Sequence, residues 1–218
     1  MDPVDRLNAI HATLNMEHGS LDDEYPEQLM LVRYVRPDAT VLELGGNVGR
    51  SSCVIASILD DSSRLVVFES DPATAAQLKD NRDANGFAFH IEAAALSREP
   101  LIQCGWDTVP WHGGVDVPEG WTPVTTREWR QTLDTYESLR FNTLVADCEG
   151  ALFYILRDHP GFLDGFETVV LENDFHQLEH KIYVDIMMAR HGLRVAHSEA
   201  GGWGPCHDRF YEVWVKAT

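Results

Sequence analysis

Basic residues are scarce in this sequence. Lys and Arg number 17 against 35 Asp and Glu in 218 residues, which gives a formal net charge of -18 at pH 7. A surface this acidic repels phosphate backbones unless a local basic patch overrides it. The best candidate for such a patch, Arg127 with Arg130, is too sparse. We therefore expect no nucleic-acid partner.

Long apolar runs are also missing. No run approaches the ~18 to 20 residues that cross a bilayer. The first residues, Met1-Asp2-Pro3-Val4-Asp5-Arg6, do not place a basic region before an apolar one, as a secretory leader would. We therefore expect a cytoplasmic protein without a membrane partner.

Cysteines are few and scattered. None of the four, Cys53, Cys104, Cys148 and Cys206, forms a Cys-x-x-Cys pair, which is typical of reduced thiols in a cytosol-like compartment. Together with the histidines they match no short zinc-ligand spacing, so we expect no zinc site of that kind.

The length and the hydrophobic content of 44% fit one domain with a substantial core. Apolar residues at helical spacing predict helices over residues 5–15 and 24–35. We expect residues 1–37 to form these N-terminal helices and residues 38–218 to form an α/β core. The acidic segment 17–23 between the helices is interpreted as a solvated connector rather than a lid.

The most informative stretch is Val41 to Gly49. An apolar run containing Glu43 ends in three glycines, Gly45, Gly46 and Gly49, and a helix is predicted from Arg50. Glycines allow positive φ and a close approach of backbone to a ligand, and a helix N-terminus favours polar or anionic groups. The stretch predicts a buried first strand that turns into the binding site of a nucleoside-like cofactor.

The glycine spacing argues against NAD. A dinucleotide fingerprint has glycines at i, i+2 and i+5, whereas here they fall at i, i+1 and i+4, after an acid at i-2. The stretch resembles the first motif of class I S-adenosylmethionine (SAM) methyltransferases, with Asn47 in place of the middle glycine, and the FkbM family in particular. The resemblance implies that Glu43 lies near the methionine end of SAM and that the turn packs against its sulfonium and ribose.

A second strand is predicted over residues 64–68 and ends in Glu69, 26 positions after Glu43 (69 - 43). An acid at that place can accept hydrogen bonds from both ribose hydroxyls. Asp71-Pro72 and Asn85-Gly86 predict the start and the end of the next helix. This region resembles the FkbM pattern Glu-Pro-x-Pro followed by Leu-x-x-Asn-x-x-x-Asn-Gly, with Ser70 replacing the first proline.

A third strand is predicted over residues 87–91, and the small residues after it are expected to line an adenine pocket. The residues expected to contact the cofactor are Glu43, Gly45, Gly46, Asn47, Gly49, Ser51, Glu69, Ser70, Ala93, Ala94 and Asp147. The irregular segment 103–122, which holds three tryptophans, is either an acceptor-binding loop or an edge hairpin that covers the core.

Acids gather where the fourth and fifth strands are predicted to end. Residues 125–128 predict a capping box that opens a helix, and the strand over 142–146 then ends in Asp147-Cys148-Glu149-Gly150. This sequence resembles the Asp-x-Glu-Gly motif of FkbM proteins. The strand over 166–171 ends in Glu172-Asn173-Asp174, followed by His176. Because ligands bind at the carboxyl edge of open α/β sheets, we expect these groups at the site.

Leu178, Ile182 and Ile186 at helical spacing predict a further helix, which Gly192 ends. Residues 193–197 and 210–216 predict two antiparallel strands, because no crossover helix fits between them. The predicted fold is α/β: a Rossmann-like, seven-stranded, mostly parallel sheet with helices on both faces and an antiparallel last strand.

The resemblance implies an enzyme that transfers the methyl group of SAM to a hydroxyl of a sugar, glycan or other small molecule. A base must take one proton, and the candidates are Asp147 first, His176 second, then Glu149 and Glu172. The oxygens of residues 147 and 172–174 suit Mg²⁺, but the family does not imply a metal and we predict none. Two alternatives stay open: methylation of a nitrogen, and an inactive SAM-binding scaffold.

Overall fold

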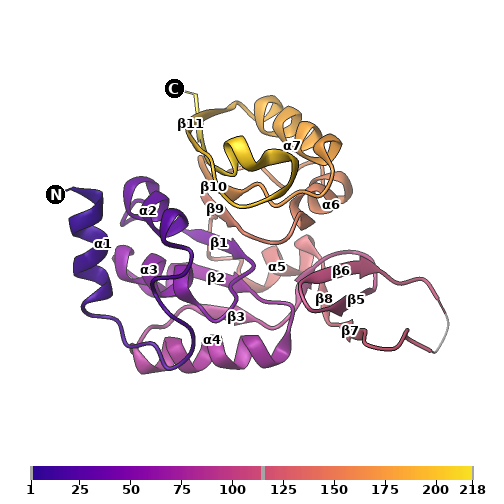
Figure 1. The fold of residues 1–218 in the computed structure, drawn as a ribbon, viewed down its shortest axis with the longest axis horizontal. Coiled ribbons are helices and arrows are strands. Elements are labelled where there is room, and N and C mark those ends of the chain that lie inside the picture. The colour runs from indigo at the N-terminus through magenta and orange to yellow at the C-terminus, as the bar shows by residue number, and fades with distance from the viewer. Residues whose placement is uncertain (1, 114–115, 218) are drawn as a thin grey trace.

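A computed structural model describes residues 2–113 and 116–217 of the chain. Its centre is a seven-stranded sheet with the order β11-β12-β10-β9-β1-β2-β3 (Figure 1). The strands are β1 (Val41–Leu44), β2 (Leu65–Phe68), β3 (His90–Glu92), β9 (Thr143–Ala146), β10 (Thr168–Glu172), β11 (Leu193–Glu199) and β12 (Tyr211–Lys216). Strand β1 pairs in parallel with β2 and β9, whereas β12 runs antiparallel to both β10 and β11.

Helices cover both faces of this sheet. They are α1 (Pro3–His11), α2 (Tyr25–Tyr34), α3 (Arg50–Ile58), α4 (Pro72–Ala84), α5 (Trp129–Thr135), α6 (Ala151–Asp158) and α7 (Leu178–Arg190), with 3-10 turns η1 (Ser62–Arg64) and η2 (Gly204–Arg209). None of the helices described is both long and apolar enough to pass through a bilayer. The predicted fold class is confirmed.

Alternating residues of the buried strands pack into two separate hydrophobic cores, one on each face of the sheet. In β1, Leu42 and Leu44 pack with residues of α6 and α7, while Val41 packs with residues of α1 to α4. Val145 and Val170 share the face of Val41. Since successive side chains of a strand point to opposite faces, Glu43, Asp147 and Glu172 follow the α1 to α4 side. This parity brings the acids at the strand exits toward α2 and α3.

Helix α4 begins and ends where the sequence predicts. The Asp71 side chain accepts a hydrogen bond of 2.7 Å from the Thr74 N–H, Pro72 is the first helical residue, and Gly86 follows the helix with φ of 66°. A residue without a side chain tolerates this left-handed conformation. The N-cap and the glycine stop together fix the length of the helix.

Several boundaries differ from the prediction. Helix α1 ends at His11, and the third strand starts at His90 instead of Phe87. The capping box predicted at residues 125–128 is wrong, because Thr126–Arg127 forms a short strand, β8, paired with β4 (Ala95–Leu96). Helix α5 therefore starts one turn later, with the Glu128 N–H donating to the Gln131 side chain at 3.0 Å.

The apolar spacing that predicts α7 does not mark its buried face. Leu178, Ile182 and Ile186 are exposed, and the helix packs through Lys181, Val184, Met187 and Met188 instead. Both faces carry apolar residues, so periodicity establishes the helix without giving its orientation.

The irregular segment folds into a small antiparallel sheet of β5 (Leu101–Cys104), β6 (Asp107–Pro110) and β7 (Thr122–Val124), with the order β6-β5-β7. It stands beside the main sheet (Figure 1). The sequence left two interpretations open for this segment, an acceptor-binding loop and an edge hairpin. Its backbone has the form of the hairpin.

Candidate functional site

A cavity of about 360 Å³ opens at the carboxyl edge of the main sheet. One wall comes from residues just past the strand ends: Leu44, Gly45, Asn47, Glu69, Ser70, Asp147, Glu149 and Glu172. The β5–β6 hairpin and α6 supply the opposite wall, with Leu101, Gln103, Trp106, Thr108, Ala151 and Tyr154 among its residues. A volume of this size is typical of small-molecule sites.

The turn after β1 needs its glycines for different reasons. At Gly45, φ is 87° and an added Cβ would lie 1.6 Å from the Asp147 carbonyl oxygen. At Gly46 and Gly49 a Cβ would press on the side chains of Val67 and Leu78, at 2.2 and 2.4 Å. Gly45 lines the cavity, whereas Gly46 and Gly49 lie behind it and let the turn pack on β2 and α4.

Glu69 is held at both of its carboxylate oxygens. Oε2 accepts from the Asn47 N–H and Oε1 accepts from the Asp71 N–H, each at 2.8 Å. The side chain is buried against protein yet lines the cavity. Because a carboxylate oxygen can accept more than one hydrogen bond, both oxygens retain the capacity to accept from a diol. Burial raises the pKa of Glu69 above its usual range, against these backbone bonds.

Glu43 lies beneath the turn and does not line the cavity. Its Oε2 accepts a 2.6 Å hydrogen bond from the Ser52 hydroxyl of α3, and its side chain is 2% exposed. Burial raises the pKa of Glu43 to about 8. The acid ties the turn to the first turn of α3 and reaches a bound molecule only through that turn.

The small residues after β3 divide between the cavity and the solvent. Ala94, Ala95 and Ser70 line the cavity, while Ala93 is exposed and lies outside it. The β4–β8 pairing fixes this register. A flat apolar patch therefore forms from Ala94 and Ala95 instead of Ala93 and Ala94.

Three carboxylates converge at the strand exits. Glu27 of α2, Asp147 after β9 and Glu172 at the end of β10 place one oxygen each within 4.8 Å of one another. The Ser51 hydroxyl donates to Glu27 Oε2 at 2.6 Å. Ser51, predicted to contact the cofactor, thus positions an acid of this cluster and does not line the cavity.

The proximity of these acids changes their protonation. Burial, and then the charge of Glu172, raise the pKa of Asp147 well above its usual range. Burial, and then the charge of Asp174, raise the pKa of Glu172 to about 8. Without a cation, the cluster holds protons near neutral pH, and such shifted groups are common where proton transfer occurs. Carboxylate oxygens in this arrangement would suit Mg²⁺, Mn²⁺ or Ca²⁺.

The other predicted acids have separate positions. Glu149 lines the cavity with φ of 51°, an exposed residue in the turn before α6. Asp174 is buried, and its Oδ1 accepts a 2.8 Å bond from the Gly150 N–H, which closes that turn. Burial raises the pKa of Asp174 to about 7. Asn173 donates to the Arg209 carbonyl at 2.6 Å and holds the chain after β10.

His176, the second candidate for the base, does not line the cavity. It is exposed, and its ring lies 4.7 Å from the ring of Trp203. Its charge lowers the pKa of Glu149, although burial of Glu149 acts more strongly in the opposite direction. The imidazole can therefore influence Glu149 but does not line the cavity with Asp147.

Sequence reasoning missed the contribution of α2. Glu24 lines the cavity with φ of 60°, and Arg50 Nη1 donates to its Oε1 at 2.9 Å. One feature of the sequence could have revealed this contribution. Met30, Leu31 and Val32 indicate that most of α2 is buried, and Glu27 lies in the same helix. An acid inside such a helix must be buried, and a buried acid requires partners.

The parallel order of the strands, the reversed β12 and the glycine turn at the carboxyl edge define a class I methyltransferase fold. No family model matches the chain. Over 103 residues it is 34% identical to the transmembrane O-methyltransferase of Propithecus coquereli, covering 43% of this chain and 38% of that protein. The match to the Macaca mulatta protein of that name has the same identity and covers 35% of it. The chain thus spans little more than a third of these curated relatives.

Solved structures share the fold over more of the chain. An O-methyltransferase from Bacillus cereus in complex with SAH superposes with a TM-score of 0.54 at 12% identity, covering 99% of this chain and 91% of that one. The ribosomal protein L11 methylase of Lactobacillus delbrueckii subsp. bulgaricus gives a TM-score of 0.53 at 11% identity, covering 88% and 77%. At these identities the likeness establishes the architecture.

Proposed function

We propose that the protein is a SAM-dependent methyltransferase of FkbM type that methylates a hydroxyl of a small molecule, sugar or glycan. The observation that carries the proposal is Glu69, whose two oxygens are anchored by the Asn47 and Asp71 N–H groups while the carboxylate faces the cavity. The names of the matched O-methyltransferases support the same activity.

The cavity offers a place for each part of the cofactor. The ribose hydroxyls would bind Glu69, adenine would lie against Ala94 and Ala95, and the methionine end would pass Gly45, which lines the cavity. SAM supplies an activated methyl group. The chain must align an acceptor with it and remove one proton.

Asp147 is the first candidate for the base, and Glu172 supports it. Both line the cavity, and burial is the main cause that raises their pKa values, joined by the charge of Glu172 for Asp147 and by the charge of Asp174 for Glu172. The shifts move both groups toward the range in which a carboxylate takes a proton efficiently near neutral pH. Glu27, which accepts a hydrogen bond from the Ser51 hydroxyl, also raises the pKa of Asp147 through its charge.

The opposite wall suits an acceptor with flat or C–H-rich faces. Trp106 of the β5–β6 hairpin is 63% exposed and Tyr154 of α6 is 40% exposed, and both border the cavity. Aromatic rings in such positions can stack on a sugar or on another ring. A sugar or another molecule with a flat face is therefore the acceptor class that we propose.

Calorimetry with SAM, its demethylated product and NAD tests the cofactor assignment. We expect SAM and its product to bind and NAD not to bind; preferential binding of NAD would end the proposal. Incubation with candidate acceptors and mass spectrometry then detects the gain of CH3 in place of H. Parallel assays with EDTA and with added Mg²⁺ test whether the three-carboxylate cluster works without an ion.

A nitrogen acceptor is the second candidate, and the acidic end of the cavity favours it. Seven acids line the cavity, Glu24, Glu69, Glu99, Asp147, Glu149, Asp158 and Glu172, and those that are ionised attract a protonated amine. Competition between amine and alcohol acceptors of the same skeleton separates the two reactions. SAM binding without transfer to either would indicate an inactive scaffold.

A further inference from the structure

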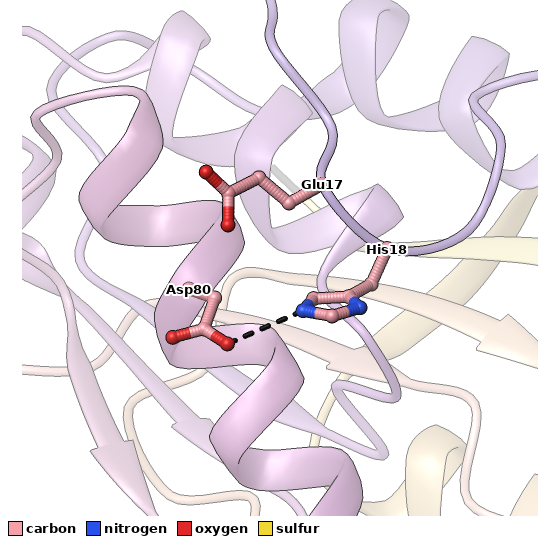
Figure 2. A group of neighbouring side chains, drawn as sticks. All are labelled: Glu17, His18 and Asp80. Atoms are coloured by element: carbon pink, nitrogen blue, oxygen red, sulfur yellow. Dashed lines mark hydrogen bonds and ion pairs between the residues drawn. The ribbon is translucent and has the colours of Figure 1, made fainter.

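A second group of potential ligands lies on the far side of the glycine turn, away from the cavity. Glu17 and His18 belong to the connector between α1 and α2, and Asp80 belongs to α4. One ligand atom from each residue lies within 4.8 Å of the other two. Figure 2 shows the three side chains converging between the connector and the helix, with His18 Nε2 3.2 Å from Asp80 Oδ2.

The backbone that carries this group is fixed. The Glu17 and His18 N–H groups donate to Asn81 Oδ1 at 2.7 and 3.0 Å, and Asn81 Nδ2 donates back to the His18 carbonyl at 2.9 Å. Asn81 is fully buried. One turn further along α4, Asn85 exchanges two hydrogen bonds with the backbone of Asn15. The ligands are therefore presented from a rigid base before any ion arrives.

We propose that Glu17, His18 and Asp80 form a binding site for a divalent transition metal, with zinc as the reference ion. One imidazole with two carboxylates is a ligand set that zinc accepts, in contrast to the all-carboxylate cluster of the cavity, which suits Mg²⁺ or Ca²⁺. The His18 and Asp80 side chains are 35% and 53% exposed, so solvent can supply the remaining ligands.

The site has a structural consequence for the cavity. The connector that holds Glu17 and His18 continues to Asp23 and Glu24, which both pair with Arg50 at the start of α3. An ion at the site joins this connector to α4 by coordination bonds, where the apo protein has only hydrogen bonds. It thereby restrains the segment that brings Glu24 to the cavity wall.

Zinc titration of the full chain by calorimetry, with excess Mg²⁺ present to occupy hard oxygen sites, tests the proposal. We expect His18→Ala and Asp80→Asn to weaken zinc binding by at least about tenfold, a loss of the size usual when a metal site is disturbed. Both variants keep the hydrogen bonds between Asn81 and the connector, because Asn81 binds only backbone atoms of residues 17 and 18. Circular dichroism confirms that they are folded.

His112→Ala is the matched control. His112 Nε2 lies 3.2 Å from Glu99 Oε2, so it forms the same kind of pair without belonging to a three-ligand group among the described residues. We expect this variant to bind zinc as the wild type does. Zinc should also raise the melting temperature of the wild type and of His112→Ala, but not that of His18→Ala. Equal zinc affinity in the wild type and His18→Ala would reduce the group to an ordinary surface ion pair and overturn the proposal.

Discussion

The Asn47 N–H donates a 2.8 Å hydrogen bond to Glu69 Oε2, so the turn after β1 and the acid after β2 form one unit. The second oxygen of Glu69 is held by the Asp71 N–H at the same distance. Each oxygen therefore has a fixed direction, and a cofactor diol would meet a carboxylate that needs no reorientation.

Glu69→Ala should weaken SAM binding by about 1 to 3 kcal/mol, the usual cost of losing charged hydrogen bonds. Calorimetry measures the change, and Glu137→Ala, at an exposed acid away from the cavity, serves as the control. Unchanged affinity in Glu69→Ala would remove the ribose assignment.

Gly45→Ala should lower the free energy of unfolding by about 2 to 5 kcal/mol, because it combines left-handed strain with overlap at the Asp147 carbonyl. Gly86→Ala separates the two effects, since Gly86 also has positive φ but no atom lies within 4 Å of its added Cβ. We expect a loss of about 1 to 2 kcal/mol there. Urea unfolding measures both, and equal losses would contradict the close approach at Gly45.

The stability of the protein should fall as pH rises from about 5 to about 8. Burial raises the pKa of folded Glu43 to about 8, from 4.5. Between these values the folded state keeps a proton that the unfolded state has lost, so the free energy of unfolding decreases with pH. Thermal unfolding across this range measures the slope.

Glu43→Gln should make that slope shallower, because the amide does not titrate and can still accept from Ser52. The raised pKa values of Asp147, Glu172 and Asp174 act in the same direction and account for the slope that remains. Glu137→Gln, at an exposed position, should keep the slope of the wild type. An identical slope in Glu43→Gln would show that Glu43 is charged in the folded protein.

Asp147→Asn should reduce kcat by about 100-fold or more while SAM still binds, because the amide cannot accept the acceptor's proton. Glu172→Gln should have a smaller effect and should also shift the pH profile to lower values, since the charge of Glu172 helps to raise the pKa of Asp147. A kcat for Asp147→Asn equal to that of the wild type would exclude it as the base. Asp134→Asn, on the exposed side of α5, controls for the loss of a carboxylate.

Lys181→Ala should lower the free energy of unfolding by about 3 to 5 kcal/mol, because it leaves Glu212 charged and unpaired in the core. Lys181 Nζ lies 2.5 Å from Glu212 Oε2, and both side chains are buried. Lys79→Ala breaks an ion pair of the same length with Asp83 on the surface, and should cost about 0.5 kcal/mol or less. Urea unfolding compares the two variants. Similar losses of stability would mean that water solvates the buried pair as it does the surface pair.

The sequence was most informative where local chemistry decides the structure. Gly45, Glu69, Asp71 and Gly86 stand at strand exits and helix ends, where one residue type fits the backbone far better than the others. The seven strands of the main sheet followed from these points and from the family resemblance, but their order in the sheet did not. Signals that lie within four or five residues were therefore enough for the fold and for half of the cavity wall.

The rest depends on contacts between distant segments. Glu27 joins Asp147 only because α2 packs across the carboxyl edge, and no local pattern encodes that packing. Ala95 lines the cavity in place of the predicted Ala93, because β4 pairs with β8, a strand 30 residues further along the chain (126 - 96). His176 is drawn to Trp203 on a loop that follows β11. Each of these outcomes is settled by packing rather than by spacing.

The insertion of β12 between β10 and β11 has a consequence for biosynthesis. Of the seven strands, it leaves the ribosome last, yet it must slide between two that are already made. Until then β10 and β11 each keep an unpaired edge, which is prone to pair with other chains. Completion of the sheet is therefore expected after translation of residue 216, and nascent chains stalled before Tyr211 should depend on chaperones.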